Sequence, residues 1–433
     1  MSSAAPSAPA AEFLALVSHA APGIQIRSKD AATFAVDGLA PGIVVSPASL
    51  PELQTVLSEA QRSRVAAIPV GAGTHLSIGN VPARYDVAIS LEAMTRVVAI
   101  EPADLTVTVE PGVRLVDLQE RLGEHGQFLP LNPPGGEGAT IGGVLAANAF
   151  GPSRYAFGTA RDWLIGLRAV HADGTSAKSG GRVVKNVAGY DMHKLHIGAL
   201  GTLGVIAEAT FKVLPLPSTR RTVAVTCGGA REACELALAA RDVGLSLHAA
   251  ELLSPATAAA VAGRSEWTLL AEVAGGAAAV ERSLRELRVL AADAGARLDE
   301  PDQVAWPAWS AAFQPRGLAL RAGGLPSQVA SIMELLDVEL GGGRALISAT
   351  AAAGIIRWVL PDGGPGTAAL IEAARASVAR VGATLVVDAA PVAIKHQIDV
   401  FGPPRADIAI MRRLKEQFDP QGILSPGRFM GRI

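Results

Sequence analysis

Three glycine-dense loops between residues 71 and 204, each beside an apolar run, constrain this 433-residue chain most strongly. They read PVGAGTH at 69–75, PPGGEGATIGGVLAAN at 133–148 and IGALGTLGVI at 197–206. Glycine permits positive φ and lets backbone N–H groups approach an anion closely. Each loop alone is also typical of a plain turn, of tight helix packing or of a strand entry. Together they indicate an extended ligand with phosphate and ring contacts, such as a dinucleotide.

Composition excludes several other classes of protein. The net charge of −2 and the 4% aromatic content give no basis for binding nucleic acid. Mean hydropathy is +0.32, but Ala accounts for most of it, and no apolar run is long enough for a spanning helix. The two cysteines, Cys227 and Cys234, are too few for a cysteine-ligated iron–sulfur cluster. They are expected to be buried small apolar residues in a reducing, cytoplasmic compartment.

Common catalytic and nucleotide motifs are missing. The sequence has no GxGxxG after a strand-like run, no Walker A lysine, no HExxH and no GxSxG. No second histidine pair supports His193 and His196 as metal ligands, so no metal site is expected. A dinucleotide site without a Rossmann fingerprint favours a flavin.

Hydrophobic patterning divides the chain into four parts. Residues 1–40 are expected to form a disordered leader, MSSAAPSAPAAEF, and a first helix. Residues 41–217 contain the glycine loops and close at Pro215-Leu-Pro217. Residues 218–398, called the cap below, show a β-α-β-β-α order twice, as in ferredoxin-like α+β domains. Residues 399–433 hold one helix and a turn-rich tail.

The four motifs PVGAGTHLSIG (69–79), PPGGEGATIGGVLAANAFGPSRYAFG (133–158), GGRVVKNVAGYDMHKLHIGALGTLGVI (180–206) and FDPQGILSPGRF (418–429) occur in the order of a known family. They resemble the vanillyl-alcohol oxidase/PCMH-type FAD-binding family. The closer resemblance is to the FAD-binding E subunit of bacterial glycolate oxidases. It implies an α+β fold: a PCMH-type FAD-binding domain of two α/β subdomains, the cap, and a tail that returns to the FAD domain.

The resemblance also implies which residues hold non-covalent FAD. The first loop surrounds the pyrophosphate, the second lines the ribityl chain and the flavin ring, and the third contacts the adenine side or the pyrophosphate. The residues so implied are Val70, Gly71, Ala72, Gly73, Thr74, His75, Pro134, Gly135, Ala139, Thr140, Gly142, Gly143, Asn148, Ser153, Arg154, Tyr155, Gly158, Gly204, Val205 and Ile206.

Two departures from the family pattern concern histidines. Relatives that attach flavin covalently use a His in the first loop, but Thr74 aligns there, which makes His75 an ordinary polar loop residue. The cap also lacks the His-x-His pair and the GDGN-plus-His segment of related 2-hydroxy-acid dehydrogenases. A 2-hydroxy acid needs a cation for its carboxylate and a base for its hydroxyl proton. Arg316, Arg321 and Arg357 are candidate cations and His248 and His396 candidate bases, yet no spacing selects among them, so the catalytic residues stay unknown.

The segment Lys185–Asp191 has two interpretations. It is either a solvated loop whose Asp191 caps the following helix or a loop that closes on the flavin.

Three functions remain open at this point. The first is an FAD-binding subunit of a glycolate-oxidase-like complex, with a second flavoprotein that oxidises a 2-hydroxy acid and an iron–sulfur subunit that removes electrons. Such a chain would reach the inner membrane only indirectly, through its partners. The second is a self-contained FAD-dependent alcohol or 2-hydroxy-acid oxidase or dehydrogenase. The third is a structural subunit, against which the intact glycine loops argue.

Overall fold

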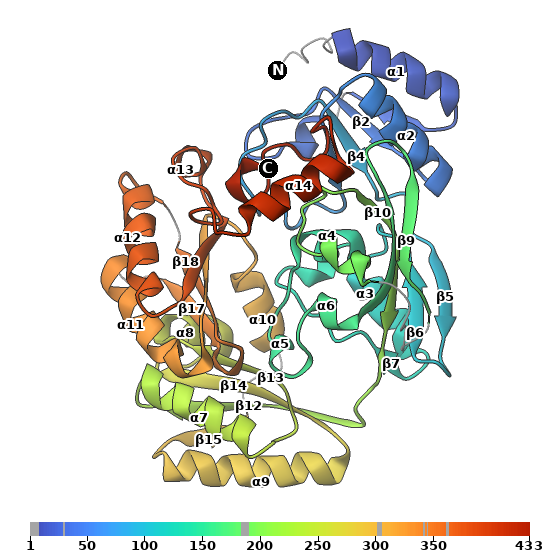
Figure 1. The fold of residues 1–433 in the computed structure, drawn as a ribbon. Coiled ribbons are helices and arrows are strands. Elements are labelled where there is room, and N and C mark those ends of the chain that lie inside the picture. Colours follow the sequence, from blue (N-terminus) through green and yellow to red (C-terminus); the bar gives the residue numbers. More distant parts are fainter. Residues whose placement is uncertain are drawn as a thin grey trace.

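The structure is a computed structural model that describes residues 8–28, 31–182, 190–300, 305–340, 343, 345–360 and 363–433. Figure 1 shows two bodies side by side, with the first half of the chain in one and the cap in the other. Red helix α14 (Ile408–Phe418) returns the chain to the first body, near its blue strands.

The first subdomain is a four-stranded sheet of order β1-β2-β4-β3 with two helices against it. β1 is antiparallel to β2, whereas β2, β4 and β3 are parallel. As predicted, α2 starts after Ser49, whose hydroxyl accepts from the N–H of Glu52. The elements are α1 (Ala8–Ala20), β1 (Gln25–Arg27), β2 (Ile43–Ser46), α2 (Leu50–Arg62), β3 (Ala67–Val70) and β4 (Val87–Ser90).

The end of the expected leader is ordered. Residues from Ala8 onward are helical, because Phe13 and Val17 are completely buried among the apolar side chains of α2 and this sheet. The prediction of disorder through Phe13 is therefore wrong from Ala8, and residues 1–7 lie outside the described part.

The second subdomain is a five-stranded antiparallel sheet of order β5-β6-β10-β8-β9. The predicted Asp173-Gly174 turn joins β8 to β9, and Asp173 accepts from the N–H of Thr175. The elements are β5 (Val97–Glu101), β6 (Thr106–Val109), α3 (Leu115–Gly123), β7 (Gln127–Phe128), α4 (Ile141–Ala147), α5 (Arg154–Phe157), α6 (Ala160–Trp163), β8 (Leu164–Val170), β9 (Ser176–Gly180), β10 (Val205–Lys212) and β11 (Leu214–Pro215), which pairs with β7.

The cap contains one eight-stranded antiparallel sheet of order β15-β12-β14-β13-β17-β18-β16-β19. This confirms the predicted double β-α-β-β-α order, with α8, β15 and α10 as additions that the sequence did not indicate. The strands are β12 (Thr219–Cys227), β13 (Leu247–Leu253), β14 (Trp267–Gly275), β15 (Arg297–Asp299), β16 (Leu318–Gly323), β17 (Leu346–Thr350), β18 (Ile355–Leu360) and β19 (Thr384–Ala389).

Helices cover both faces of the cap sheet. Five of them contribute to the larger apolar core, and α8 and α10 pack on the opposite face around Trp309. Residues 223, 224 and 225 of β12 alternate between the two cores, as expected for a strand buried on both sides. The helices are α7 (Ala230–Asp242), α8 (Pro255–Ala262), α9 (Ala277–Asp293), α10 (Ala305–Ala312), α11 (Val329–Leu340), α12 (Thr367–Ala379) and α13 (Val392–Lys395).

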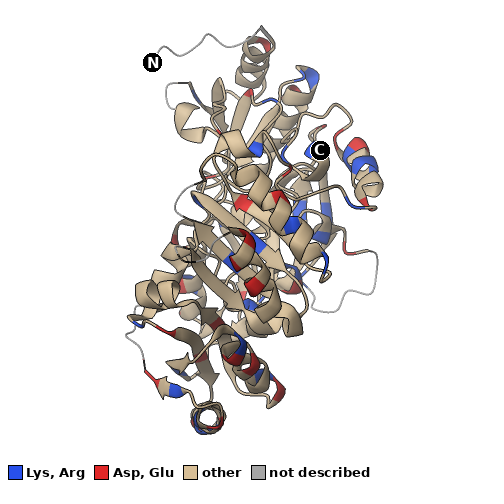
Figure 2. Ribbon diagram, turned by 90° about the vertical axis from the view of Figure 1, so that its left-hand side faces the viewer, with Lys and Arg blue, Asp and Glu red and all other residues tan. Residues whose placement is uncertain are grey.

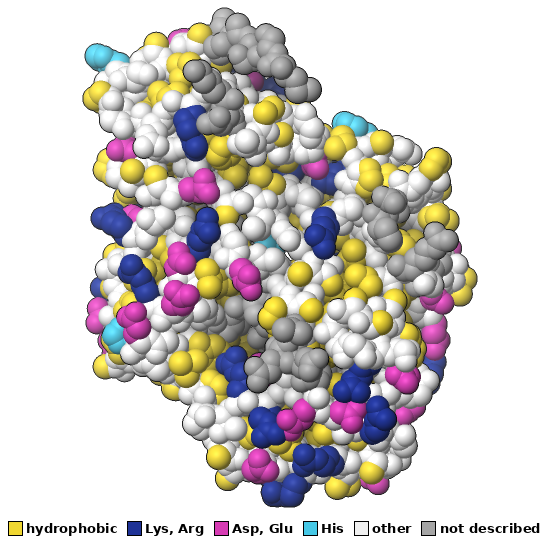
Figure 3. Space-filling model, turned by 180° about the vertical axis from the view of Figure 1, so that it is seen from behind, with side chains coloured by type: hydrophobic (Ala, Val, Ile, Leu, Met, Phe, Trp, Pro, Cys, Tyr) yellow, Lys and Arg dark blue, Asp and Glu magenta, His cyan; other side chains and the backbone are white. Residues whose placement is uncertain are grey.

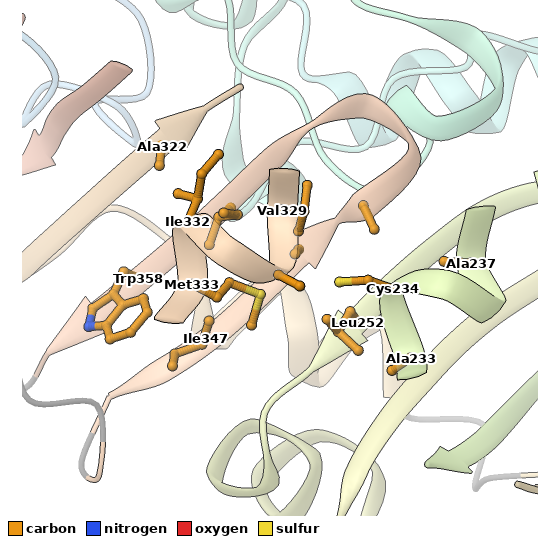
Figure 4. Close-up of a cluster of buried hydrophobic side chains, with 14 of the residues drawn as sticks. Ala233, Cys234, Ala237, Leu252, Ala322, Val329, Ile332, Met333, Ile347 and Trp358 are labelled. Carbon is orange, nitrogen blue, oxygen red and sulfur yellow. The ribbon is translucent and has the colours of Figure 1, made fainter. Parts of the chain in front are cut away.

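Both cysteines are free and buried, as predicted. Figure 4 shows Cys234 on α7 among the apolar side chains of the larger cap core, near Leu252 and Met333. Burial raises the pKa of both thiols to about 12. They therefore pack as small apolar groups.

The tail extends the first sheet. The N–H of Ala67 donates to the carbonyl of Ile423 at 2.8 Å, and the N–H of Ser425 donates to the carbonyl of Ala67 at 2.9 Å. Leu424 thereby forms a parallel bridge beside β3. This part of the tail therefore lies against the glycine-loop domain.

Charged residues of both signs are interspersed along the ribbon in Figure 2, and their side chains are interspersed over the surface seen from behind in Figure 3. Among the described residues, no helix is both long enough and apolar enough to cross a membrane.

Candidate functional site

The three glycine loops meet in one cleft that encloses about 810 Å³, its open mouth included. A Cβ on Gly71 would lie 2.1 Å from Oγ1 of Thr140, so the first and second loops touch there. A Cβ on Gly201 would lie 2.5 Å from Cγ of Pro69, which brings the third loop against the first. The N–H of Gly198 donates to the carbonyl of Leu145, joining the third loop to the second. Glycine is required at these positions because the loops themselves pack together.

The first loop presents unused donors to the cleft. Within the described residues, the backbone N–H groups of residues 72–75 have no hydrogen-bond partner. Gly73 has φ +76°, a conformation that glycine adopts without strain. Successive free N–H groups in such a turn bind phosphate oxygens. The loop therefore fits the pyrophosphate of a dinucleotide.

The second loop contributes a small-residue wall. Helix α4 starts after Thr140, whose hydroxyl accepts from the N–H of Gly143. A Cβ on Gly142 would lie 2.7 Å from Cβ of Pro111. Glycine is therefore needed here so that the segment containing Pro111 can pack against α4. Because α4 has only seven residues, we assign the anion-binding role to the N–H groups of the first loop.

Two buried cations fix the far end of the first loop. Arg428, from the tail, donates to the carbonyl of Leu76 at 2.8 Å. Lys395, from α13, donates to the carbonyl of Ser77 at 2.6 Å and to Asp37 at 2.7 Å. Arg428 also lines the cleft, and burial lowers its pKa to about 10. These two residues come from different parts of the chain, and both also pair with Asp37.

Eleven of the residues that the resemblance implied line this cleft. They come from all three loops, and they are Val70, Gly71, Ala72, Gly73, Thr74, His75, Thr140, Gly142, Gly143, Gly204 and Ile206.

The other implied residues lie elsewhere. Pro134 and Asn148 line a neighbouring pocket described below. Ala139 and Val205 are buried in the two subdomain cores. The remaining five residues line neither the cleft nor the neighbouring pocket. Gly135 lies against Ser310 and Gln314, and Gly158 lies beside Asp162. The N–H of Ser153 donates to Asn132, Arg154 lies over the ring of Phe150, and Tyr155 packs on the cap core.

A second pocket adjoins the cleft, between the glycine-loop domain and the cap sheet. It encloses about 470 Å³, and cap residues Arg321, Arg357 and Asp388 line one side of it. In the part of the chain that the structure describes, three of its lining residues carry a buried polar atom without a hydrogen-bond partner: Nε2 of His75, Oδ1 of Asn148 and Nη1 of Arg357. Buried polar atoms are nearly always paired in folded proteins, so these three, gathered in one pocket, are candidates for contact with a ligand.

The two arginines of this pocket are held differently. Arg321 forms a two-point ion pair with Asp388 at 2.9 and 3.0 Å. Arg357 donates from Nη2 to the carbonyl of Phe150 at 2.8 Å, which leaves Nη1 unused. Burial lowers the pKa of Arg357 to about 10, and the buried carboxylate of Glu251 acts in the opposite direction. Arg357 therefore remains a cation with a free donor, as carboxylate binding requires.

His75 lines both the cleft and the second pocket. It is only 8% exposed, which corrects the expectation of an ordinary polar loop residue. Its Nδ1 lies 2.9 Å from Oγ1 of Thr74. Burial lowers its pKa to about 4, although Asp388 and the carbonyl of Pro134 oppose the shift. The imidazole is therefore neutral at physiological pH.

Sequence reasoning missed several cleft residues. Pro111, His196, Leu200 and Arg428 line the cleft, and only the tail motif PGRF gave a signal for Arg428. Of the candidate cations, Arg316 is exposed and lies outside the second pocket. His248 packs against Phe128 and Phe157, and His396 is exposed, so neither candidate base lies at the pocket.

Two interpretations were given above for the segment Lys185–Asp191, and its residues 185–189 lie outside the described part of the chain. Asp191 precedes a short 3-10 helix at Met192–Leu195, but its carboxylate pairs with Lys194 and makes no capping hydrogen bond. In the part of the chain that the structure describes, no three His, Cys, Asp or Glu side chains gather as a metal site would require.

Comparison with known families agrees with this geometry. Residues 41–180 match the FAD binding domain family, and residues 404–429 match the C-terminal domain of FAD linked oxidases. The chain therefore carries an FAD-binding domain of the FAD-linked oxidase type, and FAD is its cofactor. The unpartnered N–H groups of the first loop and the small-residue cleft fit that group.

Curated relatives are similar over part of their length. Glycolate oxidase subunit GlcD of Bacillus subtilis is 35% identical over 183 residues, 42% of this chain and 39% of GlcD. Mitochondrial D-lactate dehydrogenase [cytochrome] of Arabidopsis thaliana is 35% identical over 215 residues, 49% of this chain and 37% of that protein. Glycolate oxidase subunit GlcE of Escherichia coli is 41% identical over 134 residues, 30% of this chain and 38% of GlcE. The chain thus aligns with less than half the length of these relatives.

Solved structures share the whole fold. p-Cresol methylhydroxylase superposes with a TM-score of 0.76 at 16% identity, covering 97% of this chain and 96% of that one. 4-Ethylphenol oxidase from Gulosibacter chungangensis gives 0.74 at 17% identity, covering 98% and 97%. The α+β fold of these two structures is therefore that of the whole chain.

Proposed function

We propose that this chain is an FAD-dependent oxidoreductase that oxidises a small 2-hydroxy acid to the corresponding 2-oxo acid. One observation carries the proposal: the second pocket adjoins the FAD cleft and contains a buried guanidinium, that of Arg357, with an unpartnered donor. A carboxylate is the ligand that such a donor recognises best. Relatives named for glycolate and D-lactate support the same substrate class.

Each group of the pocket has a defined part in this reaction. Arg357 binds the substrate carboxylate through Nη1, while its bond to Phe150 fixes the guanidinium. The ion pair with Asp388 holds Arg321 as the second wall of the pocket. FAD, when bound, supplies the chemistry of accepting a hydride. The site orients the 2-carbon of the substrate toward the cleft that holds the flavin.

The first test is the anaerobic absorption spectrum of the purified chain with its FAD. Glycolate and D-lactate are added separately, and bleaching of the flavin band by either one is the expected result. Arg357→Met should raise the substrate concentration needed by roughly 10- to 100-fold, the value of a lost charge-assisted hydrogen bond. The exposed Arg316→Met serves as the matched control and should leave the titration unchanged. A flavin that no 2-hydroxy acid reduces would refute the proposal.

The names of two relatives favour a second, larger proposal. GlcD and GlcE are named as subunits of glycolate oxidase. We infer that this chain works in a glycolate-oxidase-like complex with a second flavoprotein and an iron–sulfur subunit that takes up the electrons, in the cytoplasm and peripheral to the inner membrane only through those partners. The reduced chain alone should then be reoxidised slowly by oxygen and quickly by ferricyanide. Rapid reoxidation by oxygen would instead identify a self-contained oxidase.

A further inference from the structure

The histidine at the junction of the two cavities has no function in the account above. His75 lines the FAD cleft and the second pocket, and Nε2 is buried without a partner. Its other nitrogen, Nδ1, lies 2.9 Å from the hydroxyl of Thr74. If Nδ1 carries the proton and donates to Thr74, Nε2 presents a lone pair to the cavities. This is the arrangement of a proton acceptor.

Oxidation of a 2-hydroxy acid requires such an acceptor. The C2–H bond breaks with its electron pair, which passes as a hydride to FAD. The O–H bond breaks at the same carbon, and its proton must go to a base as the C=O bond forms. The substrate is thereby oxidised by two electrons, the flavin is reduced, and one proton remains on the enzyme. The histidines suggested by the sequence, His248 and His396, do not line the pocket.

We propose that His75 is the general base that accepts the hydroxyl proton of the 2-hydroxy acid, and that Thr74 fixes its tautomer. This proposal rests on the proposed function, because it assigns a residue for that reaction. A histidine that merely anchored the first loop would have both ring nitrogens bonded within the protein. Within the described residues, Nε2 of His75 instead makes no hydrogen bond, and the residue lines both the FAD cleft and the pocket of the two arginines.

The charges around the pocket suit this role. The ionisable groups are Arg321 and Asp388, which neutralise each other, Arg357 with the buried Glu251 behind it, and Arg154 over the ring of Phe150. Burial keeps the imidazole neutral, with a pKa of about 4, so it is ready to accept a proton. A carboxylate bound at Arg357 adds a negative charge beside His75 and raises the pKa of the imidazole. Substrate binding itself therefore strengthens the base.

The decisive variant is His75→Gln in the FAD-loaded chain, and His125→Gln, on the exposed loop after α3, is its matched control. We expect FAD content and the Kd for oxalate, read from the shift in the flavin spectrum, to stay within about 3-fold of wild type. The rate of anaerobic flavin reduction by glycolate or D-lactate should fall by roughly 10²- to 10⁴-fold, the usual contribution of general base catalysis. For wild type we expect this rate to fall at low pH, as the base becomes protonated, and for His75→Gln we expect that fall to be absent.

Three outcomes are distinguishable. Reduction at the wild-type rate by His75→Gln, or an unchanged low-pH limb, would overturn the role of His75 and leave the proposed function intact. A wild-type flavin that 2-hydroxy acids never reduce would overturn both. Should His75→Gln fail to retain FAD, proton uptake on oxalate binding by wild type near pH 6 decides the matter: uptake supports a base beside the carboxylate site, and its absence contradicts one.

Discussion

The ammonium nitrogen of Lys395 lies 2.7 Å from Oδ1 of Asp37, and this largely buried pair joins residues 358 positions apart. Arg428 meets the other oxygen of Asp37 at 3.3 Å. One carboxylate thus connects the N-terminal segment, the end of the cap and the tail. Both cations also donate hydrogen bonds to carbonyl groups at the end of the first glycine loop. The cluster therefore fixes the position of the loop that lines the cofactor cleft.

Lys395→Met should lower the free energy of unfolding by about 3–5 kcal/mol, because it leaves Asp37 buried beside a single cation. Urea denaturation followed by circular dichroism measures the change. The exposed Lys178→Met is the control and should change stability by less than about 0.5 kcal/mol. Equal stabilities of the two variants would contradict the structural role of the cluster.

Gly73→Val should abolish FAD retention. Its φ of +76° strains a β-branched residue by about 1–3 kcal/mol and displaces the N–H groups that face the cleft. Gly123→Val, at an exposed glycine with ordinary φ and open space around its Cα, is the control. FAD per chain after gel filtration is the measurement, and full occupancy in Gly73→Val would refute the assignment of the first loop.

Gly142→Val should act through folding as well as through the cofactor. Its side chain would meet Pro111, because even a Cβ would lie 2.7 Å from Cβ of that residue. We therefore expect a lower midpoint of urea denaturation for the FAD-free chain, whereas Gly73→Val should show its larger defect in FAD content. Unaltered stability of FAD-free Gly142→Val would show that α4 and Pro111 are not closely packed.

Stability should rise with pH between about 4 and 6.5. Burial lowers the pKa of both His75 and His196 to about 4, whereas an unfolded histidine titrates near 6.5. In that window the unfolded chain binds more protons, so the contribution of each group, on the order of 3 kcal/mol, is complete above pH 6.5 and is lost as the pH falls to 4. His196→Gln should flatten the pH dependence of the unfolding free energy by up to one proton. The exposed His125→Gln should leave the slope as in wild type.

Neither cysteine should react with a thiol reagent in the native chain. Burial raises both pKa values to about 12, so almost no thiolate is present at pH 8. Ellman's reagent should therefore label two thiols only after denaturation in guanidinium chloride. Rapid labelling of the folded protein at Cys234 would indicate that the cap core opens.

The sequence predicted most of the fold because local signals agreed with tertiary packing. Ser49 and Glu52 indicated the start of α2, and the alternating double β-α-β-β-α order of the cap is confirmed. The helices α8 and α10 were missed because they are rich in Ala and have no pronounced polar face. Phe13 was placed in a disordered leader because its burial depends on a sheet formed by later residues.

Glycine-rich loops can be recognised from the sequence alone, and so the FAD cleft was predictable in outline. The second pocket was not, because Arg321 and Arg357 reach it only through the register of β16 and β18, where they stand opposite each other. No spacing along the chain relates these arginines to His75. Whether a buried polar atom has a hydrogen-bond partner depends on three-dimensional packing, so the three unpaired atoms of this pocket could not be predicted from the sequence.

The bridge between Leu424 and Ala67 can form only after nearly the whole chain has been synthesised. Arg428 contacts the carbonyl of Leu76 across 352 residues of chain. At roughly 5–20 residues per second, a ribosome needs on the order of tens of seconds to make that stretch. During this time the glycine loops of the nascent chain lack both the neighbouring segment at Leu424 and the hydrogen bond from Arg428. We therefore expect FAD to bind only after Arg428 has been synthesised.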